Sequence, residues 1–340
     1  MHKGMNTRMN NTRMNNSRRT LFATAIVIAL STTLSLGAHA AEKKAEPGAA
    51  QKAKKHLLVV STTTGFRHDS IPLAREVIEK LGNDTGSWDT DFADAPLDMY
   101  GHQGTPDEKK ALHDAITAVL AEKMSAKALA KYDAVVFANT TGELPLPDPQ
   151  AFLDYIKAGH GFAAIHSGSD TFHSWPTNYE GKDKGAPTPY VQMLGGEFLT
   201  HHAQSENSMI IRDPNHPAMK AVAEAGKKGV PPVGDIHKNT SPEGQTWRTF
   251  DEIYLLKNND PTNLHVLLDL DKYPADGSPD AGKADQHLIA WSRLYGKGRV
   301  FYTVLGHRQE MWHDPYYQDH VKGALLYVLG LAKGSATPGK

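Results

Sequence analysis

Short apolar runs that alternate with helical segments are the feature that most constrains this chain. Residues 56–61 (HLLVVS) form one such run, and residues 71–81 then carry apolar side chains at helical spacing. The alternation recurs with runs at 134–138 and 161–166, separated by a helix predicted over 149–158. Strands that are apolar along their whole length are buried on both faces. The sequence therefore predicts an α/β fold with a mostly parallel sheet and helices on both faces.

The pattern changes from about residue 205 onward. Strands are predicted close together with few helices between them, at 208–211, 252–256, 265–270, 287–291 and 299–304. Such spacing indicates a mixed or antiparallel extension of the same sheet. An amphipathic helix is predicted over 315–329, and loops are predicted over 82–106, 174–190 and 272–285.

The N-terminal segment has the pattern of an export signal. Arg18 and Arg19 precede an apolar run over 21–36, and an A-x-A site follows at Ala38-His39-Ala40. We expect a signal peptide over 1–40, a linker over 41–55, one domain over 56–332 and a flexible tail over 333–340. The protein would then be periplasmic or secreted, without stable membrane insertion after cleavage. The paired arginines leave twin-arginine export and ordinary Sec export both open, and an uncleaved anchor is the alternative.

Composition excludes several functions. The 340 residues include no cysteine, so disulfides, a cysteine nucleophile and thiolate metal ligands are excluded. The formal net charge of −1 gives no electrostatic reason to expect a nucleic-acid partner. The chain has eighteen histidines, and their positions have to decide whether any are functional.

Polar residues follow four of the predicted strands directly. In an open α/β sheet, ligands bind beyond the carboxyl ends of the strands. The four segments are 65–68 (GFRH), 139–143 (NTTGE), 166–170 (HSGSD) and 306–310 (GHRQE). We expect all four to face one edge of the sheet.

Six motifs in register carry a family resemblance over roughly residues 56–330. They are FRH at 66–68, GFAAIHS at 161–167, LGGEF at 194–198 with two histidines after it, HP at 216–217, DEIY at 251–254, and GKGRVFY at 296–302 with GH at 306–307. In order and spacing they resemble the ThuA-like (trehalose-utilisation) family. The resemblance implies a flavodoxin-like, class I glutamine amidotransferase-like fold.

The resemblance also implies where the chemistry lies. Amidotransferases of this class place a cysteine nucleophile at a strand-to-helix elbow, and the matching position here is His166. Their catalytic histidine is matched by His307. Glutamine hydrolysis is therefore not expected, and two imidazoles should meet where a Cys–His pair would stand.

Two facing imidazoles suggest a metal site, because Zn²⁺ or Fe²⁺ binds two or three histidines plus a carboxylate. The candidate ligands are His166, His307, Glu252 and one of the adjacent pair His201 and His202, of which we favour His202. In the alternative, the same imidazoles bind a sugar through hydrogen bonds and hold no metal.

Further residues are candidates for the reaction and for sugar binding. His68 could serve as a general acid or base beside His166 and His307, or it could only anchor its loop. Aromatic faces, amides and charged groups suit a carbohydrate. The candidates for sugar contact are Arg67, Thr141, Asp170, Trp175 and Trp312.

The first functional hypothesis is an exported carbohydrate-processing enzyme with a small carbohydrate as its partner. The family name implies a disaccharide or keto-sugar, and a metal-dependent isomerase, lyase or hydrolase would fit the residues. The second hypothesis is a non-catalytic sugar-binding module on a degenerate amidotransferase scaffold. The oligomeric state stays open, with a homodimer as one option.

Overall fold

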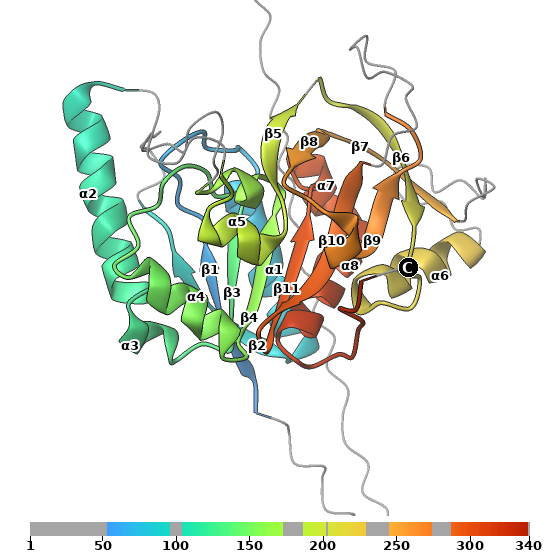
Figure 1. The fold of residues 1–340 in the computed structure, drawn as a ribbon, viewed down its shortest axis with the longest axis horizontal. Coiled ribbons are helices and arrows are strands. Elements are labelled where there is room, and N and C mark those ends of the chain that lie inside the picture. The colour runs from blue at the N-terminus through green and yellow to red at the C-terminus, as the bar shows by residue number, and fades with distance from the viewer. Residues whose placement is uncertain are drawn as a thin grey trace, which may run out of the picture. The chain divides into compact units, whose positions relative to one another are not determined.

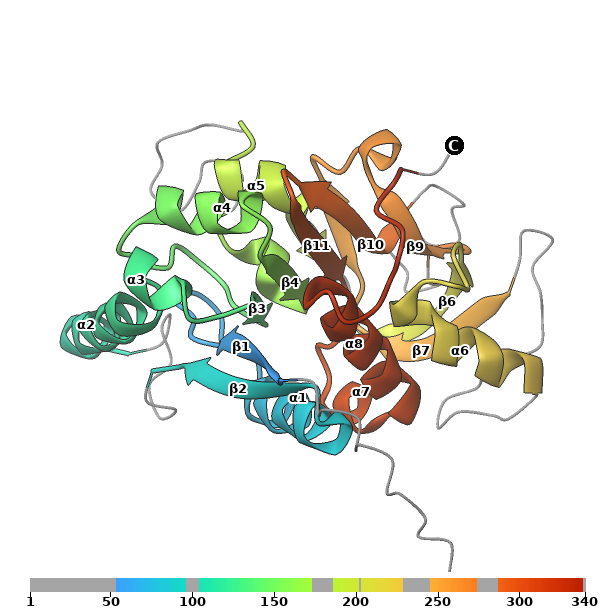
Figure 2. The same ribbon diagram turned by 90° about the horizontal axis from the view of Figure 1, so that it is seen from below.

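The computed structural model describes residues 53–95, 104–172, 186–201, 203–228, 245–273 and 287–338. Within these residues, a nine-stranded sheet lies between two layers of helices, and a two-stranded ribbon stands beside it (Figures 1 and 2). The predicted α/β fold with helices on both faces is confirmed.

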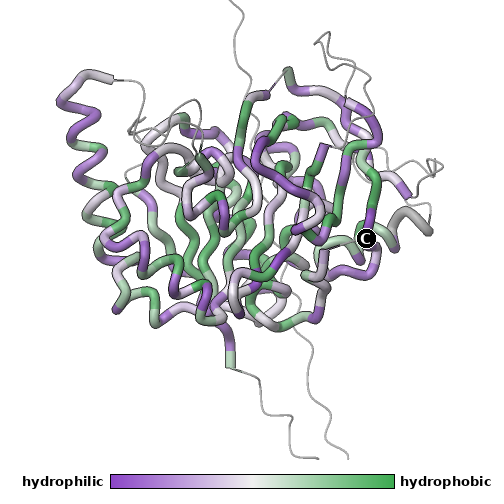
Figure 3. The backbone as a smooth tube through the Cα atoms, in the orientation of Figure 1, coloured by the Kyte–Doolittle hydropathy of each residue, from purple (hydrophilic) through white to green (hydrophobic). Residues whose placement is uncertain are grey.

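One half of the sheet is parallel. Its strands lie in the order β2 (Trp88–Ala93), β1 (Lys55–Val60), β3 (Ala134–Ala138), β4 (Gly161–Ile165) and β11 (Gly298–Thr303). Every neighbouring pair among them is parallel. This is the flavodoxin-like 2-1-3-4-5 order, in which ligands bind at the carboxyl ends of the strands. Strands β3 and β4 are buried along their whole length, and Figure 3 shows mostly hydrophobic chain in this central part of the sheet.

The other half is antiparallel, as predicted. It continues from β11 through β10 (Leu288–Tyr295), β9 (His265–Leu270), β6 (Ser205–Ile211) and β7 (Thr246–Asp251). Each neighbouring pair runs antiparallel. Strands β5 (Glu197–His201) and β8 (Tyr254–Lys257) pair separately as the ribbon.

Helices cover the two faces of the sheet. They are α1 (Ile71–Thr85), α2 (Pro106–Lys123), α3 (Ala126–Leu129), α4 (Pro149–Lys157), α5 (Pro189–Leu194), α6 (Pro217–Lys228), α7 (Gln309–His313) and α8 (Pro315–Val328), with 3₁₀ turns η1 (His166–Asp170) and η2 (Pro261–Asn263). Several helices start with a proline that follows a capping residue. Asp148 caps α4 in this way, and Asp314 caps α8. No helix among the described residues is long and apolar enough to cross a membrane.

The structure corrects two local predictions. The predicted loop over 82–106 contains β2, whose sequence WDTDFA looks polar because this edge strand pairs only with β1 and buries mainly its two ends. The strand predicted over 252–256 begins two residues later, since β7 ends at Asp251 and β8 starts at Tyr254. Glu252 therefore lies in a connection.

The C-terminal tail reaches back over the antiparallel half. The carbonyl of Ser335 accepts a hydrogen bond from Ser292, and the carbonyl of Thr337 accepts one from His265. Arg299 donates to the carbonyl of Ala332. These bonds hold the tail as far as Thr337, in the region for which the sequence suggested flexibility.

Buried His320 should make the stability of this fold depend on pH. Its Nδ1–H donates to the carbonyl of Ala218, and its Nε2 accepts from the Thr303 hydroxyl. Burial lowers the pKa of His320 from 6.5 to about 4, so the unfolded chain binds a proton on this residue between those values and the folded chain does not. Stability contributed by this residue is present above pH 6.5 and is lost as the pH falls toward 4, by about 3 kcal/mol at most.

We expect His320→Asn to lose part of this dependence. The variant should be less stable at pH 7, and its free energy of unfolding should fall less between pH 7 and pH 4.5 than that of the wild type. Urea unfolding at the two pH values measures both effects. If the free energy of unfolding fell by the same amount between pH 7 and pH 4.5 in the variant and the wild type, His320 would not contribute to the pH dependence.

Candidate functional site

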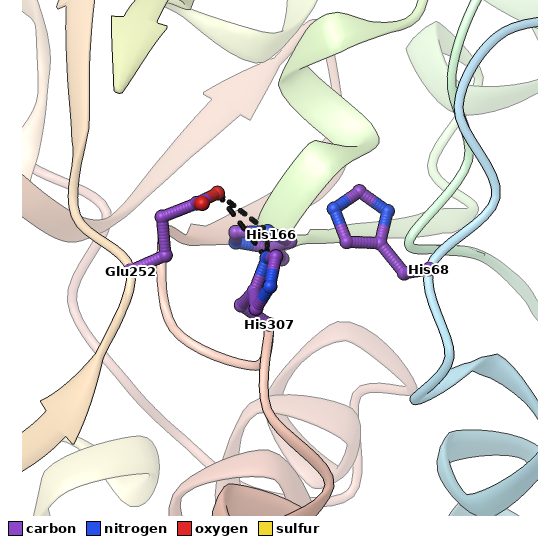
Figure 4. Close-up of side chains that lie close together, drawn as sticks. All are labelled: His68, His166, Glu252 and His307. Carbon is purple, nitrogen blue, oxygen red and sulfur yellow. Dashed lines mark hydrogen bonds and ion pairs between the residues drawn. The ribbon is translucent and has the colours of Figure 1, made fainter. Parts of the chain in front are cut away.

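Four side chains from distant parts of the sequence converge at the carboxyl end of the parallel half. His68 follows β1, His166 follows β4, His307 follows β11, and Glu252 comes from the connection between β7 and β8 (Figure 4). One potential ligand atom from each lies within 4.8 Å of the other three. We call these four residues the His–Glu centre.

His166 stands at a sharp turn out of β4. Its φ of 50° is in the left-handed region, an unusual conformation for a residue other than glycine, and it resembles the strained elbow that carries a nucleophile in related folds. The Nδ1–H donates to the carbonyl of Val304 at 2.7 Å, so the lone pair is on Nε2, which faces the centre. Burial, then the neighbouring His307, lowers the pKa of His166 to about 3.

Three groups lie close to Nε2 of His166. It lies 3.2 Å from Nδ1 of His307, and the Tyr254 hydroxyl donates to it at 2.8 Å. The Oε2 atom of Glu252 lies 3.6 Å away. The pKa of Tyr254 is raised well above its usual value by burial and by the Glu252 charge, so the phenol keeps its proton and acts as a donor.

Glu252 supplies the negative charge of the centre. Its Oε2 lies 3.2 Å from Nδ1 of His307, and its Oε1 lies 2.9 Å from Nδ1 of His201. Burial acts to raise the pKa of Glu252, but the hydrogen bonds from His201 and His307 outweigh it and hold the pKa well below the usual range. The carboxylate therefore stays ionised.

His68 lies on the other side of His166 and His307 from Glu252 (Figure 4). Its ring meets those of His166 and His307 edge-to-face, with centroids 4.7 and 5.0 Å away. Its Nδ1 lies 3.2 Å from the Ser167 hydroxyl. Burial, then His166 and His307, lowers the pKa of His68 well below 6.5, so the imidazole is neutral.

The loop that carries His307 is fixed by buried hydrogen bonds. The Asp251 carboxylate accepts from the backbone N–H groups of Gly306 at 2.7 Å and Arg308 at 3.2 Å. The Trp312 indole donates to the carbonyl of Gly306. Burial raises the pKa of Asp251 to about 6.

Three of the residues predicted to contact sugar are buried and have partners inside the fold. Arg67 is buried and pairs with Asp94, Thr141 donates to the carbonyl of Phe66, and Trp312 is fully buried. These three side chains hold the loops in place. They supply the hydrogen-bond and ion-pair partners that buried backbone groups and buried charges need.

Two predicted residues, the metal ligand His202 and the sugar contact Trp175, lie outside the described residues. The backbone carbonyl of Asp170 accepts a hydrogen bond from Gly142, which ties the turn after β4 to the loop after β3.

From the sequence, one residue of the site was ranked second and two others were missed. His201 was the less favoured of an adjacent pair, yet it contacts Glu252. Asp251 and Tyr254 flank Glu252 in the motif at 251–254. Tyr254 donates to His166, and Asp251 holds the loop that carries His307. Their proximity to Glu252 in sequence was the only available signal.

The His–Glu centre has the donor set of a divalent-metal site. Neutral imidazoles and an ionised carboxylate are the forms in which these side chains bind Zn²⁺ or Fe²⁺. The hydrogen bond from His166 to Val304 is the kind of partner that fixes the orientation of a ligating histidine. The four residues therefore fit a metal ion by type and proximity.

Strand order and site together define an α/β protein of flavodoxin-like topology with a His–Glu centre at the carboxyl ends of its parallel strands. A family model described as trehalose utilisation, ThuA, matches residues 56–228 and 232–328. The chain belongs to the ThuA family, and this membership supports a sugar-related role.

Solved structures with similar folds are distant from this chain. A ThuA-like protein from Parabacteroides merdae has 19% identity and a TM-score of 0.49, with 83% of this chain and 93% of that chain covered. A cytoplasmic protein from Salmonella typhimurium has 13% identity and a TM-score of 0.46, with 81% of this chain and 98% of that chain covered. A β-galactosidase from Bacillus circulans sp. alkalophilus has 8% identity and a TM-score of 0.43, with 81% of this chain and 30% of that chain covered. No curated protein matches the chain significantly.

Proposed function

We propose that this protein is an exported, divalent-metal-dependent enzyme that processes a carbohydrate, with a keto-sugar derived from a disaccharide as its substrate. One observation carries the proposal: ligand atoms of three histidines and one glutamate lie within 4.8 Å of one another in a sugar-related family. The proposed export depends on the segment over 1–40, and N-terminal sequencing of the mature protein tests it.

In this proposal, His166, His307 and Glu252 hold the ion, which would polarise a sugar carbonyl as a Lewis acid. His68 faces them and moves the proton. The Ser167 hydroxyl can either donate to Nδ1 of His68 or accept from it, so Nε2 can act as a base or as an acid. Removal of a proton from the carbon next to the carbonyl leaves its electron pair for an enolate. Return of the proton to the former carbonyl carbon gives isomerisation, and return to the original carbon from the other side gives epimerisation. In C–O cleavage, the enolate electron pair instead expels the oxygen substituent on the next carbon, and this oxygen takes the proton held by His68.

One contact favours the second candidate, a metal-free sugar-binding module. The Tyr254 hydroxyl already donates to Nε2 of His166 at 2.8 Å, so this lone pair has a partner without an ion. Stoichiometric metal in protein purified from its native compartment would support the enzyme. Sugar binding without metal or turnover would support the module.

We expect His68→Ala to slow proton transfer and to leave bound metal in place. The readout is deuterium exchange, followed by NMR in D₂O, at the carbon next to the carbonyl of a keto-trehalose probe. Loss of general acid–base catalysis should slow exchange by about 10²–10⁴-fold.

The control variant is His113→Ala, on the exposed face of α2, which should match the wild type in both measurements. If His68→Ala loses its metal, His68 is a ligand and not the proton carrier. If the wild type shows neither metal nor exchange, the proposed enzyme is refuted.

A further inference from the structure

A pocket of about 310 Å³ opens directly beside the His–Glu centre. Two of the residues that line it, His68 and His307, also belong to the centre. The others are Phe66, Asp69, Gln204, Arg308, Gln309 and Glu310. We call this the Phe66 pocket.

Phe66 forms an aromatic wall of the pocket on a rigid loop. It is 51% exposed, one of three large hydrophobic side chains exposed among the described residues. Its ring meets His68 edge-to-face, with centroids 4.8 Å apart, and its carbonyl accepts from the Thr141 hydroxyl at 2.7 Å. The preceding Gly65 lies so close to Thr141 that an added Cβ would be 2.9 Å from its hydroxyl oxygen. The loop is therefore held before any ligand arrives.

Arg308 provides a polar wall that is also held in place. Its guanidinium donates to Gln204 at 2.7 Å, lies 2.9 Å from Glu310, and stands over the Phe250 ring at 4.8 Å. Its backbone N–H is bound by Asp251, next to the centre. The wall thus presents guanidinium, amide and carboxylate groups with little conformational entropy left to lose.

The charges of the pocket argue against an anionic ligand. The pocket contains one guanidinium and the two carboxylates of Asp69 and Glu310, so no excess positive charge faces a phosphate. Mixed donors and acceptors opposite an aromatic ring suit a neutral polyhydroxylated ring. The volume is at the lower end of the roughly 300–1,000 Å³ seen for ligand pockets, so it favours one such ring.

We propose that the Phe66 pocket binds the second ring of a disaccharide, stacked on Phe66, while the reacting ring lies at the His–Glu centre. This proposal rests on the function proposed above, and it makes Phe66 a determinant of disaccharide specificity. His68 and His307 line the pocket and also belong to the centre, so a ring bound in the pocket would adjoin a ring bound at the centre.

Calorimetric titration of the metal-loaded protein with trehalose and with glucose tests the proposal. The wild type should bind trehalose more tightly than glucose. Phe66→Ala should weaken trehalose binding about tenfold and leave glucose binding and metal content unchanged, because only the stacked ring is lost. Phe66→Trp should restore the trehalose affinity. Leu294→Ala, on β10 and similarly exposed at 52%, is the matched control and should bind both sugars like the wild type.

The outcomes separate the two proposals. If Phe66→Ala weakens the binding of both sugars equally, or of neither, the Phe66 pocket is not a second-ring subsite. This holds even if the protein binds metal and catalyses exchange. In the opposite case, the wild type binds no metal and catalyses no exchange, but it prefers trehalose and Phe66→Ala does not. The subsite then stands and the proposed enzyme fails.

Discussion

Glu252→Gln should lower the affinity for Zn²⁺ by more than about 100-fold, beyond the 10–100-fold expected for a residue that only orients a ligand. The substitution keeps the shape of the side chain but removes the only carboxylate among the four residues of the His–Glu centre. Three imidazoles would remain, and His201 would lose its carboxylate partner. Competition titration of Zn²⁺ against a chelator measures the change.

Glu79→Gln, on the exposed side of α1, is the matched control and should bind Zn²⁺ like the wild type. Circular dichroism of both variants should match the wild type, because Glu252 lies in a connection and not in the sheet. Equal Zn²⁺ affinity in Glu252→Gln and the wild type would contradict a metal role for this carboxylate.

Gly323→Ala should destabilise the domain by about 3 kcal/mol or more, or prevent folding, since overpacking of this kind forces backbone shifts. Gly323 lies in α8 where that helix crosses the start of α6. An added Cβ would lie 2.0 Å from the carbonyl oxygen of Pro217 and 2.7 Å from the amide nitrogen of Ala218. In an open helix the same change would stabilise by up to about 1 kcal/mol, so the sign of the effect tests the packing.

Gly86→Ala separates steric overlap from backbone strain. Gly86 has a φ of 61° with nothing within 4 Å of an added Cβ, so only conformational strain is introduced, at a cost of roughly 1 kcal/mol. Urea unfolding of both variants gives the comparison. A Gly323→Ala protein as stable as Gly86→Ala would mean that α8 and α6 do not approach so closely.

Those strands of the sheet that are buried on both faces could be predicted from the sequence, because burial requires apolar residues. Strands β1, β3 and β4 are buried on both faces and are therefore apolar along their length, which makes them visible without a structure. Strand β2 is an edge strand whose middle residues are exposed or only partly buried, so its Asp and Thr residues hid it. The ribbon strand β5 was missed for the same reason, because it is only partly buried.

The site could be predicted in part. His68, His166 and His307 each follow a strand of the parallel half, and topology alone brings such residues to one edge. Glu252 was proposed from its motif, although its strand was wrongly placed. Sequence alone could not show the partners inside the fold that Arg67 and Trp312 have, because the positions of Asp94 and of the Gly306 carbonyl depend on the folded loops.

The position of β11 has a consequence for how the chain is made. This strand is the last of the eleven along the described chain, yet it lies between β4 and β10 in the middle of the sheet. During synthesis the growing chain therefore exposes two unpaired strand edges at its centre until residues 298–303 leave the ribosome. His307 emerges only after that strand, so no truncated product that lacks the last forty or so residues can assemble the centre. Nascent chains that stall late should accordingly depend on chaperones far more than the finished protein.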